Sequence, residues 1–147
     1  MMSVLRVASS KATDIARGVS RLLAEHGFST LNEFSLKNSR RADVIGLDKR
    51  GTIIIVEVKS SPADFRSDAK WPEYLDHCDR FYFAVDDAFP TDILPADEGL
   101  ISADKFGAEI IREASVRKVN AARRKSLTLK FARTAAARLK EFTDPPV

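Results

Sequence analysis

The stretch of sequence that decides the fold runs from Arg41 to Lys59 and reads RADVIGLDKRGTIIIVEVK. It contains two β-rich segments, predicted as strands over 42–48 and 52–60, on either side of Lys49-Arg50-Gly51. That tripeptide suits a hairpin loop in which a type I turn is followed by a left-handed glycine. The stretch therefore predicts an antiparallel hairpin of defined register within a larger sheet.

The predicted register gathers charged side chains at one end of one hairpin face. Pairing Asp48 with Thr52 sets the other pairs on that face, because side chains alternate along a strand. These pairs are Leu47 with Ile53, Ile45 with Ile55, Asp43 with Glu57, and Arg41 with Lys59. The opposite face, on which Ala42 pairs with Val58, is apolar and suits packing against a helix.

Two carboxylates that face each other across a hairpin repel, and a divalent cation would remove that repulsion. Mg²⁺ or Mn²⁺ prefers hard oxygen ligands and commonly takes one or two protein carboxylates together with a substrate phosphate. Lys59 follows Glu57 by two residues and so shares its face. A Glu-x-Lys triplet alone usually marks an ordinary ion-pair face. Here the preceding Ile-Ile-Ile-Val run and the facing Asp43 favour a metal site with Asp43, Glu57 and Lys59 as catalytic residues.

The rest of the chain predicts an α/β domain with a central mixed sheet flanked by helices. Apolar periodicity indicates a first helix over 13–26 and one or two basic helices over 116–142. A further helix is predicted to start at Ser61-Pro62, with Ser61 as N-cap and Asp64 completing a capping box by a reciprocal hydrogen bond. Further strands are predicted over 31–37, 80–85, 99–103 and 108–111. We expect one domain over 1–147, with a core at about 12–112 and a basic C-terminal helical segment at about 115–142.

Composition narrows the possible function classes. No window is apolar enough to cross a membrane, and Cys78 is the only cysteine, so a reducing cytoplasm is expected. Residues 112–141 hold ten basic and two acidic residues, a net charge of +8, so the remainder carries −5. This asymmetry favours a nucleic-acid partner, whereas nothing indicates a nucleophilic Ser or Cys constellation or a glycine-rich phosphate loop.

The hairpin residues resemble the PD-(D/E)xK nuclease superfamily, in which an Asp on one strand precedes Glu-x-Lys on the next. Asp43 and Glu57-Val58-Lys59 match that pattern. A longer resemblance, over about residues 12–142, is to the MmcB family of bacterial DNA repair proteins. It is carried by the segments RRADVIGLDKRGTIIIVEVKSS, DFRSDAKWPEYLDHCDRFYFAV, GLISAD and ARRKSLTLKFAR.

The resemblance implies a restriction-endonuclease-like fold and a cytoplasmic role in the response to DNA damage. By position it implies that Asp43 and Glu57 are metal ligands, that the Val58 carbonyl is a further ligand, and that Lys59 is the catalytic lysine. Many superfamily members add an acidic residue from the first helix or strand. Three residues compete for that role, and Glu33 is preferred over Asp14 and Glu25.

Two segments are candidates for contact with nucleic acid. The segment after the active strand offers Lys70, Trp71 and Tyr74 to a phosphate or an unstacked base, although a lone Trp before a Pro is commonly a packing anchor. The basic helix offers Arg123, Arg124 and Lys125, with a solvated helix face as the alternative. Both sets are expected to bind DNA.

The sequence thus predicts a Mg²⁺- or Mn²⁺-dependent nuclease that hydrolyses damaged, branched or single-stranded DNA. Its expected partners are DNA and other DNA repair proteins, with no membrane. The alternative is a non-catalytic DNA-binding or scaffold component of a repair complex. Metal binding that depends on Glu57 distinguishes the enzyme from the scaffold.

Overall fold

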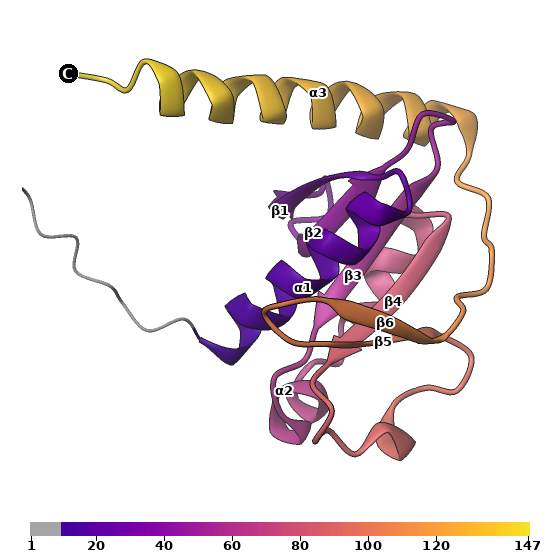
Figure 1. The fold of residues 1–147 in the computed structure, drawn as a ribbon. Coiled ribbons are helices and arrows are strands. Elements are labelled where there is room, and N and C mark those ends of the chain that lie inside the picture. The colour runs from indigo at the N-terminus through magenta and orange to yellow at the C-terminus, as the bar shows by residue number, and fades with distance from the viewer. Residues whose placement is uncertain (1–9) are drawn as a thin grey trace, which may run out of the picture.

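A six-stranded mixed β-sheet forms the centre of the protein, and helices lie on both of its faces (Figure 1). The computed structural model describes residues 10–147, so the first nine residues of the domain predicted over 1–147 lie outside the described part. The elements are α1 (Lys11–Glu25), β1 (Ser29–Ser35), β2 (Arg41–Leu47), β3 (Ile53–Val58), α2 (Pro62–Ser67), η1 (Trp71–His77), β4 (Arg80–Val85), η2 (Thr91–Ile93), β5 (Gly99–Ala103), β6 (Ala108–Arg112) and α3 (Ala121–Thr143).

The strands lie in the sheet in their order along the chain, from β1 to β6. The first three pair antiparallel, β3 to β5 pair parallel, and β6 returns antiparallel to β5. The parallel step from β3 to β4 requires a crossover, and α2 with η1 supplies it. The predicted α/β class and mixed sheet are confirmed.

The β2–β3 hairpin has the predicted register, with Ile45 opposite Ile55 and Leu47 opposite Ile53. Gly51 closes the loop at φ +83°, where a side chain would be strained, so the left-handed glycine is confirmed. The three pairs predicted beyond this part of the ladder, Asp43–Glu57, Ala42–Val58 and Arg41–Lys59, are wrong, because the ladder ends at Val44 and Val56. Ala42 instead packs in the same hydrophobic cluster as Ile45, three residues away, which strict alternation does not allow. The strand therefore bends at Asp43.

Helix α1 covers one face of the sheet. Ser10 caps its N-terminus by accepting a hydrogen bond from the Thr13 backbone N–H at 3.1 Å, three residues before the predicted start. Its buried apolar stripe packs on Val44, Ile54, Val56 and other side chains of that face. At Gly18 the helix lies directly against the backbone carbonyls of the β5–β6 loop, leaving no room for a Cβ atom. This close approach fixes the position of α1 across the sheet.

The opposite face is covered by α2, η1 and the first half of α3. Ser61 caps α2 as predicted, because its hydroxyl accepts a hydrogen bond from the Asp64 N–H at 3.1 Å. The reciprocal bond predicted for Asp64 is wrong in detail, since the Asp64 carboxylate accepts from the Ser60 N–H rather than from Ser61. Ser61 has a φ of −157° and a ψ of 159°, so the extended cap presents the N–H one residue earlier.

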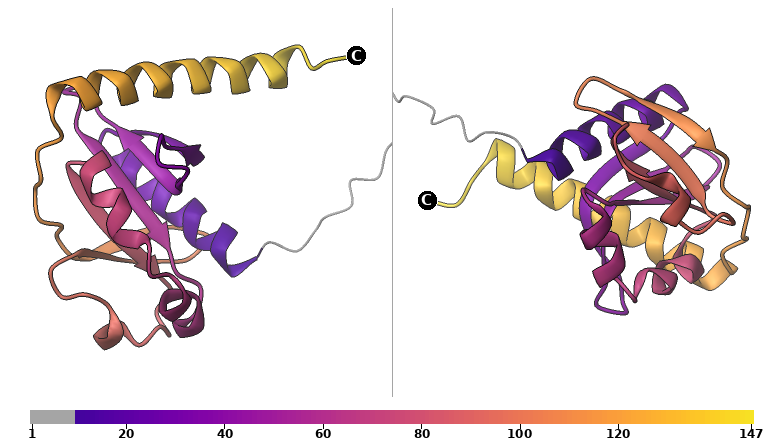
Figure 2. Two further views of the ribbon diagram at one scale, coloured as in Figure 1. Left: turned by 180° about the vertical axis from the view of Figure 1, so that it is seen from behind. Right: turned by 90° about the horizontal axis from the view of Figure 1, so that it is seen from below.

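Helix α3 is one continuous helix, and its second half projects past the sheet (Figure 2). The sequence predicts an apolar stripe of Leu127, Phe131, Ala135, Leu139 and Phe142. Only Leu127 and Phe131 are buried, whereas Leu139 is 62% and Phe142 88% exposed. The stripe is therefore a core contact in its first half only; in the second half Arg138 reaches β1, while Leu139 and Phe142 stay uncovered.

A buried carboxylate anchors the start of α3. Asp79 accepts hydrogen bonds from the Arg124 guanidinium at 2.6 and 2.7 Å and from the N–H groups of Ile53 and Val119 at 2.8 and 3.0 Å. Burial raises the pKa of Asp79, but these bonds outweigh it and hold the pKa below its ordinary range. Arg124 also donates to the Gly51 carbonyl at 2.7 Å. The ion pair thus joins α3 to the hairpin loop.

Arg124→Ala is expected to lower the free energy of unfolding by about 2–4 kcal/mol, because it leaves the Asp79 carboxylate buried without its cation. Chemical denaturation at neutral pH measures the change. Arg123→Ala is the matched control, since among residues 10–147 the Arg123 guanidinium donates only to the Asp76 carbonyl, at 3.1 Å. Equal losses for the two variants would contradict the anchoring role.

No helix in the described part of the chain combines the length and the apolar character that a membrane span requires.

Candidate active site

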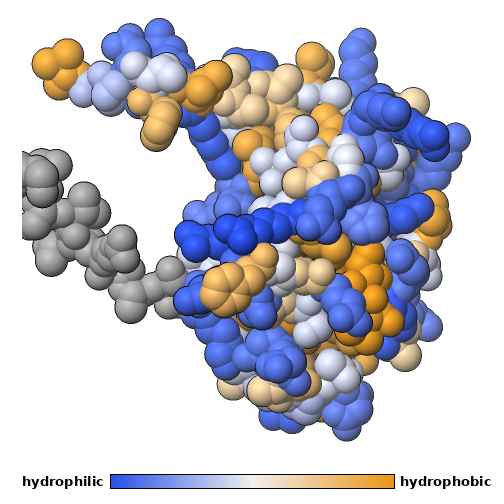
Figure 3. Space-filling model, viewed as in Figure 1, coloured by the Kyte–Doolittle hydropathy of each residue, from blue (hydrophilic) through white to orange (hydrophobic). Residues whose placement is uncertain are grey.

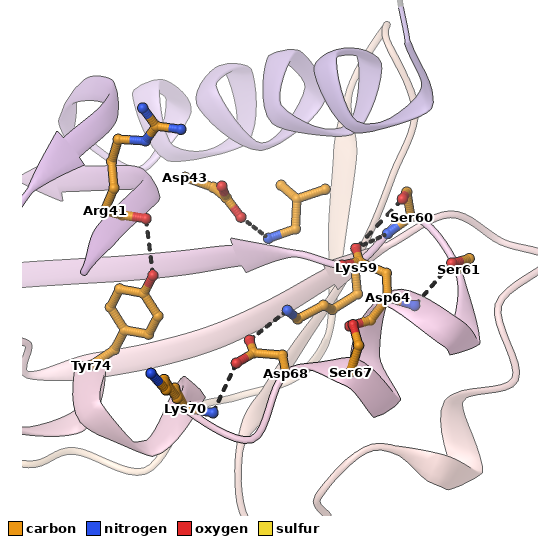
Figure 4. Close-up of polar contacts among 11 residues, drawn as sticks. Arg41, Asp43, Lys59, Ser60, Ser61, Asp64, Ser67, Asp68, Lys70 and Tyr74 are labelled. Carbon is orange, nitrogen blue, oxygen red and sulfur yellow. Dashed lines mark hydrogen bonds and ion pairs between the residues drawn. The ribbon is translucent and has the colours of Figure 1, made fainter. Parts of the chain in front are cut away.

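Asp43 and Glu57 lie at the point where β2 and β3 part. They occupy the next step of the register after the last pair, Val44 with Val56. The Asp43 carboxylate accepts a hydrogen bond from the Val58 N–H at 2.8 Å (Figure 4). This N–H points toward β2, so Asp43 takes the place that a strand carbonyl would fill. Because the N–H and C=O of one residue point to the same side of a strand, the Val58 carbonyl also faces Asp43.

Glu57 is a buried acid without a full set of partners. It is 4% exposed, and its Oε1 atom has no hydrogen-bond partner within residues 10–147. Burial is the main cause that raises the pKa of Glu57 to about 10, and the neighbouring Asp43 carboxylate raises it further. Tyr74 and Lys59 offset only part of this rise. Glu57 is therefore protonated at neutral pH unless a cation compensates its charge.

Lys59 lies beside these carboxylates and is held by a third acidic residue. Its Nζ atom is 2.6 Å from the Asp68 carboxylate, and Lys59 is 5% exposed. Asp68 is itself fixed, because its other oxygen accepts from the Lys70 N–H at 2.9 Å (Figure 4). Partial burial raises the pKa of Asp68, but the hydrogen bond and charge of Lys59 outweigh it and lower the pKa. Asp68 thus orients the ammonium group.

These residues form the floor of an open groove of about 1460 Å³ between α1, β1 and the segment that follows β3. Its lining includes seven cationic side chains: Arg17, Arg21, Arg40, Arg41, Lys59, Lys70 and Arg138. It also includes five acidic ones: Glu33, Asp43, Asp64, Asp68 and Glu57. A recessed acidic floor with cationic walls suits a phosphodiester backbone whose phosphate meets a metal at the floor.

A family model described as "DNA repair protein MmcB-like" matches residues 4–146, which is nearly the whole chain. The chain belongs to the MmcB-like family of DNA repair proteins. A solved structure described as "SPO1766 protein of unknown function from Silicibacter pomeroyi" is similar to it, with a TM-score of 0.91 and 47% identity over 95% of each chain. No curated protein matches the chain. Membership of this family supports a role in DNA repair and an interaction with DNA.

In this MmcB-like protein, Glu33 is the one of the three competing acids that lines the groove. It lies between the pairs Asn32–Val44 and Phe34–Ala42, and so opposite Asp43, with an unusual φ of +49°. Asp14 and Glu25 do not line the groove. No group of three or more His, Cys, Asp or Glu side chains within residues 10–147 is arranged to hold a metal ion. The candidate donor set is therefore Asp43, Glu57 and the Val58 carbonyl, with Glu33 at the rim.

In the segment after α2, some side chains line the groove and others pack against the core. Lys70 is exposed at the groove, and Tyr74 lines it while donating from its hydroxyl to the Arg41 carbonyl at 2.9 Å. Burial raises the pKa of the Tyr74 hydroxyl, which keeps it protonated as a donor. Trp71 is half-buried and stacks on Phe81, with ring centroids 5.9 Å apart. Trp71 therefore has the position of a packing anchor, which the sequence analysis gave as the alternative to contact with DNA.

The basic residues at the start of α3 lie away from the groove lining. Arg124 is committed to Asp79, and Arg123 to the Asp76 carbonyl, whereas Lys125 is exposed. The groove is instead lined by Arg17 and Arg21 of α1 and by Arg138 of the second half of α3. Arg17 and Arg21 were missed by the predictions from sequence; their helical spacing, four residues apart on the polar side of the first helix, is the signal that could have found them.

Proposed function

We propose that the protein is a divalent-metal-dependent nuclease that hydrolyses DNA phosphodiester bonds during repair. The observation that carries the proposal is the buried Glu57 oxygen beside Asp43, which has no hydrogen-bond partner among residues 10–147 and lies at the floor of a cationic groove. A buried pair of carboxylates is costly, and a hard cation with oxygen ligands removes that cost. Asp43, Glu57 and the Val58 carbonyl are the oxygen donors that Mg²⁺ or Mn²⁺ prefers.

The residues around this donor set have defined roles in the proposal. A bound Mg²⁺ or Mn²⁺ supplies a Lewis acid that polarises the scissile phosphate and eases deprotonation of water. Lys59, held by Asp68, places a positive charge next to the carboxylates, where charge develops on the phosphate in the transition state. Its low exposure keeps that charge poorly screened by solvent. Lys70 and Arg41, both exposed at the groove, are placed to bind flanking phosphates.

Calorimetric titration of the protein with Mn²⁺ tests the metal site directly. We expect one site in the wild type and a loss of affinity of about tenfold or more in Glu57→Gln and in Asp43→Asn, because each substitution removes a charged oxygen ligand. Asp87→Asn, an exposed acid that does not line the groove, is the control. DNA binding that persists in variants and wild type alike without any Mn²⁺ uptake would favour the scaffold over the enzyme.

A further inference from the structure

The two walls of the groove differ in a way that bears on which form of DNA it accepts. One wall is α1, which presents Arg17 and Arg21 one turn apart, with the small side chains of Ala16 and Ser20 next to them. Arg17 is exposed, and no ion pair within residues 10–147 engages it. Arg21 is also exposed and donates to the Phe106 carbonyl at 3.2 Å. This wall therefore offers exposed positive charge and allows a backbone to approach the helix closely.

The other wall includes the projecting half of α3. Arg138 lines the groove and donates to the carbonyls of Asn32 and Glu33 at 2.7 and 3.0 Å, which holds this part of the helix against β1. Phe142 lies one turn further along and so shares the face of Arg138. It is 88% exposed and packs in neither hydrophobic cluster. Figure 3 shows open space beneath the projecting end of the helix, faced by mainly hydrophilic side chains on the body of the protein.

An exposed aromatic ring beside an arginine is the arrangement on which unpaired bases stack, because every base has a π-face. In a duplex the bases are already stacked on each other and cannot reach such a ring. The carboxylates are also recessed, with Glu57 only 4% exposed, so a phosphate has to descend between the walls to meet them. A single strand can do so, whereas the second strand of a duplex would meet the walls.

We propose that the groove binds single-stranded DNA, with Arg17 and Arg21 contacting its phosphates and Phe142 stacking on a base. This rests on the proposed function for what happens at the groove floor, but the binding itself does not require cleavage. It moves the main DNA contacts from the start of α3 to the groove walls. The projecting half of α3 is then a wall of the DNA site rather than an unused end.

Fluorescence anisotropy tests the proposal with a short labelled single strand of mixed sequence, in EDTA so that the probe is not cut. We expect Arg17→Ala to reduce the slope of log K against log salt by about 0.7, the share of one phosphate on a single strand. Phe142→Ala should weaken binding about fivefold or more with the slope unchanged, because stacking carries no charge. Unlabelled duplex of the same sequence should compete less well than the single strand.

Matched controls are Arg50→Ala, an exposed arginine of the hairpin loop, and Leu129→Ala, an apolar residue of α3 that is 56% exposed on another face. Both should bind like the wild type. Wild-type affinity in Arg17→Ala and Phe142→Ala, tighter binding of duplex, or equal binding of RNA would each overturn the proposal. Normal binding without metal-dependent cleavage would leave this proposal standing and refute the nuclease, so the two failures are distinguishable.

Discussion

Asp43→Asn and Lys59→Ala are each expected to lower metal-dependent DNA cleavage by about 10²–10³-fold, the usual cost of removing one preorganised electrostatic contact. In the proposed metal site Asp43 supplies a charged ligand oxygen, which asparagine replaces with a neutral one of the same size. Lys59 supplies the buried cation of the groove floor. Cleavage of labelled single-stranded, duplex, flapped and gapped DNA in Mg²⁺ and in Mn²⁺ measures the loss.

The controls separate chemistry from folding. Lys59→Ala leaves Asp68 without its ion pair, so its thermal melt is measured together with that of Lys59→Gln, which keeps a hydrogen-bond donor near Asp68. Asp87→Asn should cleave like the wild type. Cleavage that survives both Asp43→Asn and Lys59→Ala at wild-type rates would mean that another site, or a contaminating nuclease, performs the reaction. Removal of metal with EDTA should abolish cleavage in the wild type.

The hairpin could be predicted from the sequence because its determinants are local. Alternation of side chains and a three-residue loop ending in Gly51 set the register, which puts Asp43 and Glu57 just beyond its last pair, Val44 with Val56. The bend that parts the strands there could not be predicted. It lies opposite Glu33, which has a φ of +49° on the neighbouring strand β1.

The partners of individual charged residues also could not be predicted from the sequence. Asp68, nine residues after Lys59, holds its ammonium only because α2 folds back beside β3. Arg124 belongs to a basic run that suggests DNA binding, yet its guanidinium forms an ion pair with Asp79, 45 residues away. A run of like charges can be read from the sequence. Which member of the run is neutralised by a buried partner depends on the tertiary structure.

Glu57→Gln is expected to stabilise the metal-free protein at neutral pH. The pKa of Glu57 is raised to about 10 in the folded state, against an ordinary value of 4.5, chiefly by burial. Between these two values the folded state binds a proton that the unfolded state does not. The free energy of unfolding therefore falls as pH rises, by up to about 1.4 kcal/mol per pH unit for this group. Below pH 4.5 the contribution is fully present, and glutamine has no such dependence.

Urea denaturation in EDTA at several pH values between 6 and 8 measures this effect. The stability of Glu57→Gln minus that of the wild type should be positive and should grow with pH. Glu109→Gln, an exposed glutamate of β6, should follow the wild type throughout. Parallel curves for Glu57→Gln and the wild type would show that Glu57 is ionised in the metal-free protein, and the argument from its burial would then be wrong.

Adding metal should reverse the order of the two proteins. A divalent cation that binds only the folded state stabilises it by about 2.7 kcal/mol at a concentration one hundred times its Kd. In the wild type it also displaces the Glu57 proton, so its apparent affinity should rise with pH. Glu57→Gln has no carboxylate at this position to bind the cation. Its melting temperature should therefore respond only weakly to Mg²⁺ or Mn²⁺. The same buried carboxylate thus weakens the free protein and strengthens the metal-bound one, which is the behaviour expected of a ligand rather than of a core residue.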